Sequence, residues 1–255
     1  MSEHIEISRD GAVQTIRMNR PDKKNAITRA MYAAMAKALT DGDADDTVRV
    51  HLILGVPGAF SSGNDLADFM AVATGGEQGT EVADFLQALA LAQKPVVSGV
   101  DGIAVGIGTT INFHCDLTLA TPRTRFHTPF VDLGLVPEAG SSLLAPAIMG
   151  HARAAAMLML GEPMDAEGAD RAGFVTAIVT GDALLDHARA KAAALMAKPP
   201  QALMATRRLM KGDPAALQAR IAEEARLFRE ALASPEAQEA FMAFFEKRAP
   251  VFKRA

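Results

Sequence analysis

The chain has 255 residues, of which 49% are hydrophobic and 22% charged, and its formal net charge is -4. This composition is typical of a globular protein with one large domain or a domain plus an appendage, and so mild a charge argues against a nucleic-acid partner. The single cysteine, Cys115, excludes an internal disulfide and a zinc cluster built on cysteines, and it fits a reducing cytoplasm.

The two ends of the chain show no targeting signal. The first residues, MSEHIEISRDG, have no apolar h-region, and the last four, FKRA, do not match a peroxisomal address. No apolar run reaches the roughly 18 residues that a bilayer-spanning helix needs. We therefore expect a cytoplasmic protein with no membrane segment.

The N-terminal third of the chain predicts a hairpin, a helix and a buried strand. Residues 4–8 and 13–19 alternate apolar and polar side chains around the turn dipeptide Asp10-Gly11. Apolar residues at helical spacing predict a helix over 28–39 with Thr28 as its N-cap, and a strand follows over 48–56. Asp65 is placed to cap a short helix up to residue 70, before a glycine-rich loop over 71–80.

Strands and helices alternate through the middle of the chain, which indicates an α/β fold. In chain order we predict a helix over 81–93, a buried strand region over 95–105, a helix over 107–114, strands over 117–120 and 124–127, helices over 141–149, 152–160 and 166–172, and a strand over 175–179. We place the α/β core at 1–195 and a helical C-terminal region at 196–255, with helices over 201–211, 215–233 and 235–247.

The segment FHTPFVDLGLVPEAGSS, residues 126–142, carries one acid in apolar surroundings. Glu138 lies among leucine, valine, proline, alanine and glycine, and no lysine or arginine occurs between Arg125 and His151. Poor solvation would raise the pKa of this carboxyl and make it a proton carrier near neutral pH. The alternative is an ordinary solvated glutamate in a surface loop.

Two backbone turns follow the two buried strands. They are Phe60 to Asp65 and Gly106-Ile107-Gly108. If the strands are parallel neighbours, the turns meet at one sheet edge, where ligands bind in open α/β folds. The Ile107 amide would also open a helix, so two N–H groups aimed at one oxygen would form an oxyanion hole. The alternative is a pair of ordinary tight turns.

Other catalytic signatures are missing from the sequence. There is no dinucleotide fingerprint, phosphate loop or nucleophile elbow, and the six histidines show no metal-ligand spacing with acids. We therefore expect neither a metal nor a cofactor. We interpret His127 as a hydrogen-bonded strand residue and Cys115 as a small buried residue.

Taken together, these motifs resemble the crotonase superfamily, the enoyl-CoA hydratase/isomerase group. The resemblance covers nearly the whole chain and rests on NRP at 19–21, NAI at 25–27, FSSGNDLADF at 60–69, KPVV at 94–97 with Gly102, Ala104 and Gly106, the pair Cys115-Asp116, and residues 126–140. It implies a spiral of ββα units, also shared with ClpP-like proteins, and a C-terminal helical region that assembles trimers, commonly as a dimer of trimers. The expected partners are therefore an acyl-CoA thioester and further copies of the chain in a homotrimer or hexamer.

The resemblance also assigns roles to particular residues. It implies that the Asn64 and Ile107 amides hold the thioester oxygen, and that Ser62, Gly63, Asp65, Gly106, Thr110, Phe130 and Pro137 line the substrate pocket. Coenzyme A is then part of the substrate and no separate cofactor is needed. Lys23, Lys24, Ala26 and Arg29 are the candidates for contact with coenzyme A.

Two departures from the family pattern bear on the reaction. Typical hydratases carry two glutamates that activate a water, and the matching positions here are Thr110 and Phe130. Glu138 remains, in a segment similar to that of the peroxisomal-type Δ3,Δ2-enoyl-CoA isomerases. We therefore expect an isomerase that moves a double bond from C3 to C2 with Glu138 as its one proton carrier. The alternatives are an enoyl-CoA hydratase or another crotonase-type acyl-CoA reaction, a non-catalytic acyl-CoA-binding module, and an oligomerisation scaffold.

Overall fold

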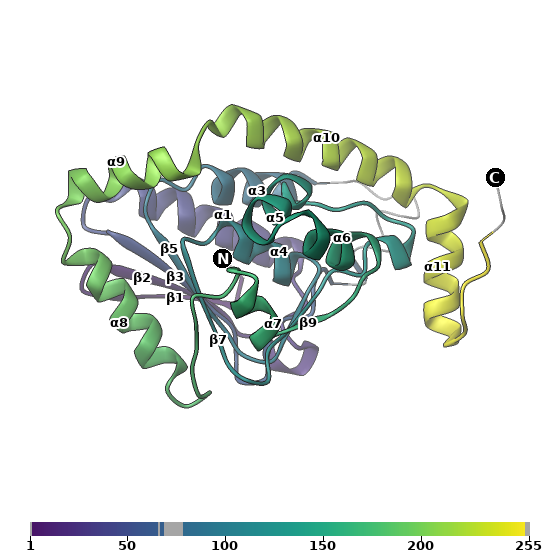
Figure 1. Ribbon diagram of the computed structural model, residues 1–255, viewed down its shortest axis with the longest axis horizontal. Helices are drawn as coiled ribbons and strands as arrows, with labels where there is room; N and C mark the ends of the chain where they lie inside the picture. Colours follow the sequence, from purple (N-terminus) through teal and green to yellow (C-terminus); the bar gives the residue numbers. More distant parts are fainter. Residues whose placement is uncertain (1, 66, 69–78, 253–255) are drawn as a thin grey trace.

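The computed structural model describes residues 2–65, 67–68 and 79–252 of the chain. Figure 1 shows a layered core with helices α8, α9 and α10 following one another around its outside, and α11 at the end remote from α8. The helices are α1 (Arg29–Ala44), α3 (Glu81–Ala90), α4 (Ile107–His114), α5 (Ser141–Met149), α6 (His151–Met159), α7 (Ala166–Arg171), α8 (Leu184–Met196), α9 (Pro200–Lys211), α10 (Pro214–Leu232) and α11 (Pro235–Glu246), with 3-10 turns η1 (Pro21–Lys23) and η2 (Val131–Leu133).

Two sheets form the core of the described part of the chain. The larger has the strand order β1-β2-β3-β5-β7-β10 and the smaller the order β4-β6-β8-β9. Their strands are β1 (Ile5–Asp10), β2 (Val13–Met18), β3 (Val50–Leu54), β5 (Val96–Val100), β7 (Leu117–Ala120) and β10 (Ala177–Ile178) in the larger sheet, and β4 (Ala59–Ser61), β6 (Ile103–Val105), β8 (Arg125–His127) and β9 (Met164–Asp165) in the smaller. Among the strand pairs of the described residues, β1–β2 and β8–β9 are antiparallel and the others are parallel.

The chain repeats one unit three times. β3, β4 and α3 form the first ββα unit, β5, β6 and α4 the second, and β7 and β8 lead to α5 in the third. Each unit adds one strand to each sheet, so β3, β5 and β7 are neighbours in the larger sheet while β4, β6 and β8 are neighbours in the smaller. This confirms the expected α/β spiral of ββα units.

The larger sheet is covered by apolar side chains on both faces. Val50, Leu52 and Leu54 of β3 pack on one side with Leu184 and other residues of α8. Ile53 of the same strand points to the opposite face and joins the main core under α1 and α3. Burial on both faces explains why these strands are continuous apolar runs in the sequence.

Several predicted boundaries change in the structure. The region 95–105 is two strands, β5 and β6, which belong to different sheets, and the turn after 48–56 contains the strand β4. Both bends contain turn residues, Asp101-Gly102 in the first and Pro57-Gly58 in the second, which the prediction did not use as strand boundaries. The predicted helix over 28–39 extends to Ala44, with Thr28 as its N-cap as expected. The strand predicted over 175–179 is limited to Ala177 and Ile178, and β9 was not predicted. The predicted loop over 71–80 lies mostly outside the described residues.

The C-terminal helices pack on the core through specific neighbours. α10 lies against α3 and α5, and α11 lies against η2. Polar anchors fix α9, since Arg207 binds Asp116 at 2.8 Å and Lys211 donates to the carbonyl of His114 at 2.5 Å. The helical C-terminal region also forms one wall of the two cavities beside the smaller sheet, through residues of α10 and α11.

Gly102 at the bend between β5 and β6 provides a test of this architecture. Its φ is +77°, and a Cβ atom there would lie 2.0 Å from the carbonyl oxygen of Gly58. We predict that Gly102→Ala lowers the unfolding free energy by roughly 1–2 kcal/mol for the backbone conformation and by about 1–3 kcal/mol more for the clash. Urea unfolding measures the loss.

Gly11→Ala is the matched control for that substitution. Gly11 also has a positive φ, +55°, but a Cβ atom there meets no atom within 4 Å. It should therefore show only the backbone part of the cost. Equal destabilisation by both substitutions would contradict the tight passage between the two sheets.

Candidate active site

Glu138 lies in the loop that enters α5. The next two residues, Ala139 and Gly140, have φ values of +59° and +70°, so the chain reverses sharply after the glutamate. Ala139 is held in this unfavourable conformation because its carbonyl accepts a hydrogen bond from His114 Nε2 at 2.7 Å. The Glu138 side chain points inward and is only 8% exposed.

The surroundings of Glu138 favour its protonated form. Burial, and then the negative charge of Glu224, raise the pKa of the Glu138 carboxyl to about 8. Within the described part of the chain, its Oε1 atom has no hydrogen-bond partner. Of the two initial interpretations, the structure therefore supports the poorly solvated acid over a solvated loop glutamate. A carboxyl with a pKa near neutrality can both take and return a proton.

Glu138 lies where two cavities meet. The tyrosine chamber, of about 280 Å³, is lined by Ile27, Tyr32, Val82, Leu86, Ile221, Ala225 and Leu232, with Arg29, Asp65, Asp68, Glu81 and Arg229 among its charged residues. The phenylalanine chamber, of about 630 Å³, is lined by Phe130, Leu133, Leu135, Ala240, Phe241 and Phe244, with the turn residues Ser62, Gly63 and Gly106. Asn64, Glu138 and Phe228 line both chambers.

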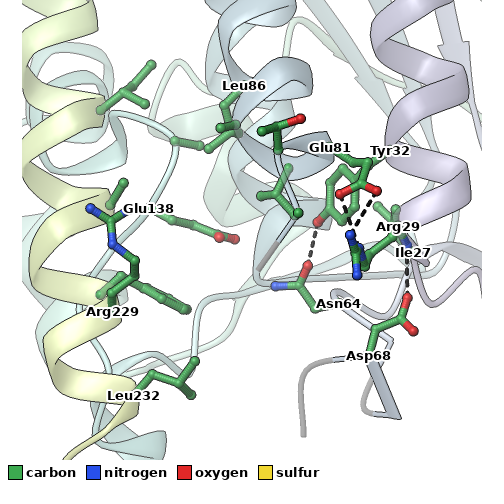
Figure 2. A pocket seen from close by; sticks show the side chains of 18 of the residues that line it. Ile27, Arg29, Tyr32, Asn64, Asp68, Glu81, Leu86, Glu138, Arg229 and Leu232 are labelled. Carbon is green, nitrogen blue, oxygen red and sulfur yellow. Dashed lines mark hydrogen bonds and ion pairs between the residues drawn. The ribbon is translucent and has the colours of Figure 1, made fainter. Parts of the chain in front are cut away.

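Figure 2 shows the tyrosine chamber, with Glu138 pointing into it from one side and Asn64 and Tyr32 on the opposite wall. Arg229 and Leu232 belong to α10, which runs along the side from which Glu138 enters. The acid thus projects into a space bounded by apolar side chains.

The two backbone turns are side by side. β4 and β6 are parallel neighbours, with Ala59 opposite Ile103 and Ser61 opposite Ala104, so the turns that follow them share one edge of the smaller sheet. Gly63 makes the close approach, because a Cβ atom there would lie 3.1 Å from the carbonyl oxygen of Val105.

The amides of Asn64 and Ile107 are available for a ligand. Among the described residues, neither N–H donates a backbone hydrogen bond, and Ile107 is the first residue of α4. Unused N–H groups at a helix start favour a developing negative charge. Asn64 lines both chambers together with Glu138, whereas Ile107 is fully buried and is not among the residues that line them.

Tyr32 was not singled out in the sequence. It is 1% exposed, and its hydroxyl donates a hydrogen bond of 2.5 Å to Oδ1 of Asn64. Burial, and then the charge of Glu138, hold the pKa of Tyr32 well above its usual value, so it stays a neutral donor. Tyr32 thereby fixes the side chain of Asn64, which lines both chambers. The available signal was that Tyr32 is the chain's single tyrosine, on the apolar face of a predicted helix.

The other predicted pocket residues divide into two groups. Asp65 lines the tyrosine chamber, pairs with Arg20 at 2.6 Å, and accepts hydrogen bonds from the Ala67 and Asp68 amides, as expected of a cap. Thr110 is fully buried and Pro137 is half-buried, and neither is among the residues that line the two chambers.

The four residues considered for contact with coenzyme A lie in different places. Ala26 lines the phenylalanine chamber, whereas Arg29 lines the tyrosine chamber and is paired with Glu81 at 3.0 Å. Lys23 and Lys24 are exposed, and their carbonyls accept hydrogen bonds from Ser62. Their backbone therefore braces the first turn.

The remaining candidates are structural in character. The backbone of His127 pairs with Gly106 and Thr109, and its side chain lines the phenylalanine chamber. Burial raises the pKa of the Cys115 thiol to about 12, which makes it a poor nucleophile. The described residues contain no group of three or more His, Cys, Asp or Glu placed to hold a metal ion, and no helix among them is long and apolar enough to cross a bilayer.

Comparison with known proteins gives consistent matches. A family model described as enoyl-CoA hydratase/isomerase matches residues 8–255. Enoyl-CoA delta isomerase 2 of Rattus norvegicus is 34% identical over 97% of this chain, which spans 64% of that protein's length. The 2,3-dehydroadipyl-CoA hydratase of Escherichia coli K12 is 32% identical over 99% of both chains. The crystal structure of an enoyl-CoA hydratase/isomerase from Pseudoalteromonas atlantica T6c has a TM-score of 0.93 and 38% identity, and the match covers 98% of this chain and 100% of the other.

The raised pKa of Glu138 predicts a pH-dependent stability. The folded protein holds this proton up to about pH 8, whereas the unfolded chain releases it near pH 4–5. The folded state therefore binds more protons in this window, and the contribution of Glu138 to the unfolding free energy falls as pH rises through it. Urea unfolding from pH 5 to 8 should show wild type losing a few kcal/mol relative to Glu138→Gln. The same pH dependence in both proteins would mean that the carboxyl is solvated.

Proposed function

Because this chain belongs to the enoyl-CoA hydratase/isomerase family, we propose that it is an acyl-CoA isomerase that moves a double bond from C3 to C2 of an enoyl-CoA thioester. The observation that carries the proposal is the single buried acid: among the described residues that line the two chambers, Glu138 is the one buried carboxyl. Moving a double bond requires one group that removes a proton and returns it.

Each step of the reaction has a residue for it. Glu138 in its ionised form removes a proton from C2 of the 3-enoyl thioester, and the electron pair moves onto the thioester oxygen to give a dienolate. The amides of Asn64 and Ile107 stabilise that oxygen, each by roughly 10²–10³ in rate. Glu138 then gives its proton to C4, which leaves the double bond between C2 and C3 and restores the carboxylate.

The walls of the cavity favour isomerisation over hydration. Phe130 stands at one of the positions where hydratases of the family carry an acid, and it lines the phenylalanine chamber. Thr110, at the other position, is fully buried and its hydroxyl lies 3.5 Å from the Ile107 carbonyl. Neither can activate a water as a carboxylate does. We further propose a cytoplasmic location, on the strength of the single cysteine.

The substitution Glu138→Gln tests the proposed base. With 3-hexenoyl-CoA as substrate and the absorbance of the conjugated thioester as readout, we expect kcat to fall by roughly 10² or more. Binding of a saturated acyl-CoA should be kept, because the amide has the same shape. Glu167→Gln, which removes an exposed acid of α7, should retain the activity of wild type.

Three results would redirect the assignment. Equal turnover by wild type and Glu138→Gln would remove the proposed base. If wild type hydrates 2-hexenoyl-CoA faster than it isomerises 3-hexenoyl-CoA, the hydratase alternative is favoured. The 32% identity with the Escherichia coli hydratase is the observation behind that alternative. Binding of acyl-CoA with neither reaction would indicate a binding module.

We also propose that the chain assembles as a homotrimer or a hexamer. Large apolar side chains are exposed in the single chain, including Leu209 at 79% and Met210 at 83% on α9 and Phe244 at 61% on α11. Patches of this kind mark protein interfaces. Gel filtration with light scattering should give the mass of three or six chains, whereas a stable monomer would contradict the proposal.

A further inference from the structure

A second buried acid reaches the active site from the C-terminal helices. Glu224 lies in the middle of α10 and is 4% exposed. Its Oε2 accepts a hydrogen bond from the Gly140 N–H at 2.5 Å, and its Oε1 accepts from the N–H and the hydroxyl of Ser142 at 3.0 and 2.5 Å. Both carboxylate oxygens are therefore occupied by donors.

These donors form the start of α5. Gly140 is its N-cap position and supplies no side chain, so the first N–H groups of the helix need an acceptor from elsewhere. A carboxylate is the preferred partner there, because it also faces the positive end of the helix dipole. Glu224 performs this capping from a position more than 80 residues further along the chain.

The capped turn is the one that carries Glu138. Gly140 is two residues from the proposed base, and the Ser141 N–H donates to the Glu138 carbonyl at 3.0 Å. Ala139 between them has a left-handed backbone, which costs roughly 1–2 kcal/mol in a non-glycine residue. His114 of α4 holds this turn from one side and Glu224 of α10 from the other.

Glu224 also acts on Glu138 through its charge. After burial, the negative charge of Glu224 is the largest cause of the raised pKa of Glu138. Other polar groups around the acid include Tyr32 of α1, which is neutral, and His114 of α4, whose pKa burial lowers to about 4. The phenylalanine chamber, which Glu138 also lines, adds His127, Asp132 and Arg248. Two cations of α10 lie nearby: Arg220 donates to the Ser142 hydroxyl at 3.1 Å, and Arg229 lines the tyrosine chamber. The remaining charged residues of that chamber are Arg29, Asp65, Asp68 and Glu81.

We propose that Glu224 is a positioning residue for the reaction: it fixes the loop that presents Glu138 to the substrate, and it places a second buried carboxylate next to that loop. This inference rests on the proposed function in so far as Glu138 is the base. It assigns to α10 a part in the chemistry in addition to its part as a wall, where Ile221, Ala225 and Leu232 face the substrate space.

Glu224→Gln tests both parts of the proposal. The amide keeps the shape but loses the charge and one acceptor, so the turn is held less firmly. We expect kcat to fall by about 10–100-fold with KM little changed, because a small displacement of a catalytic group has effects of that size. We expect the acid limb of the pH profile of kcat/KM to move to lower pH, because an opposing negative charge has been removed.

Glu223→Gln is the matched control. Glu223 is the preceding residue on the same helix, and its side chain is 57% exposed and pairs with Arg220 at 3.3 Å. The substitution makes the same change in net charge on the solvent side. It should leave kcat and the pH profile as in wild type, and a shift as large as that of Glu224→Gln would overturn the specific role of Glu224.

A titration that does not depend on turnover separates this inference from the proposed function. The 13C signal of the Glu138 carboxyl, assigned by its loss in Glu138→Gln, should titrate at lower pH in Glu224→Gln than in wild type. An unchanged titration with unchanged kcat would overturn the proposal even if wild type is an isomerase. A shifted titration in a protein without isomerase activity would sustain the contact while refuting the function.

If Glu224→Gln does not fold, two serine substitutions test the positioning role of Glu224 instead. Ser142→Ala removes one of the three donors to Glu224, and we expect a severalfold loss of kcat at unchanged KM. Ser8→Ala removes an exposed hydroxyl of β1, a strand that lines neither chamber, and kcat should be kept. Equal kcat in both variants would overturn the positioning role.

Discussion

The structure depends on keeping one carboxyl group away from water without giving it a cation. Glu138 is buried between two cavities and its pKa is raised to about 8. A chain can hold an acid in this state only if other contacts supply the stability that desolvation removes. Here those contacts lie in the backbone on either side of Ala139, where His114 and Glu224 hold the turn from separate helices. The acid itself is left without bonds at Oε1 among the described residues, and so is free to react.

The second constraint is the parallel pairing of β4 and β6. Each ββα unit of the spiral places one strand in the smaller sheet, so the turns after these strands meet at one edge. The amides of Asn64 and Ile107 thereby lie in turns at the same edge although 43 positions separate them along the chain. Because backbone groups supply the donors, this part of the site depends on glycines and on strand register rather than on particular side chains.

Local patterns in the sequence predicted much of this arrangement. The N-cap of α1 at Thr28, the helix that begins at Ile107 and the apolar company of Glu138 are all properties of neighbouring residues, and the structure has each of them. The passage of the strands from one sheet to the other was not predicted, because a turn dipeptide such as Asp101-Gly102 does not reveal which sheet the next strand joins. The roles of Tyr32 and Glu224 were missed for a different reason. Their partners, Asn64 and Gly140, are 32 and 84 residues away, and only the fold brings them together.

α10 lines the tyrosine chamber and also caps α5 through Glu224, and this combination limits how the site can diverge. Residues that would be exchanged to admit a longer or bulkier acyl tail, such as Ile221 and Ala225, flank the position of Glu224 on one short stretch of helix. A shift of that helix to enlarge the cavity would move the carboxylate that anchors the catalytic turn. Under the proposed function, chain-length preference and acid strength are therefore coupled traits, and variants selected for new substrates should carry compensating changes around Ser142.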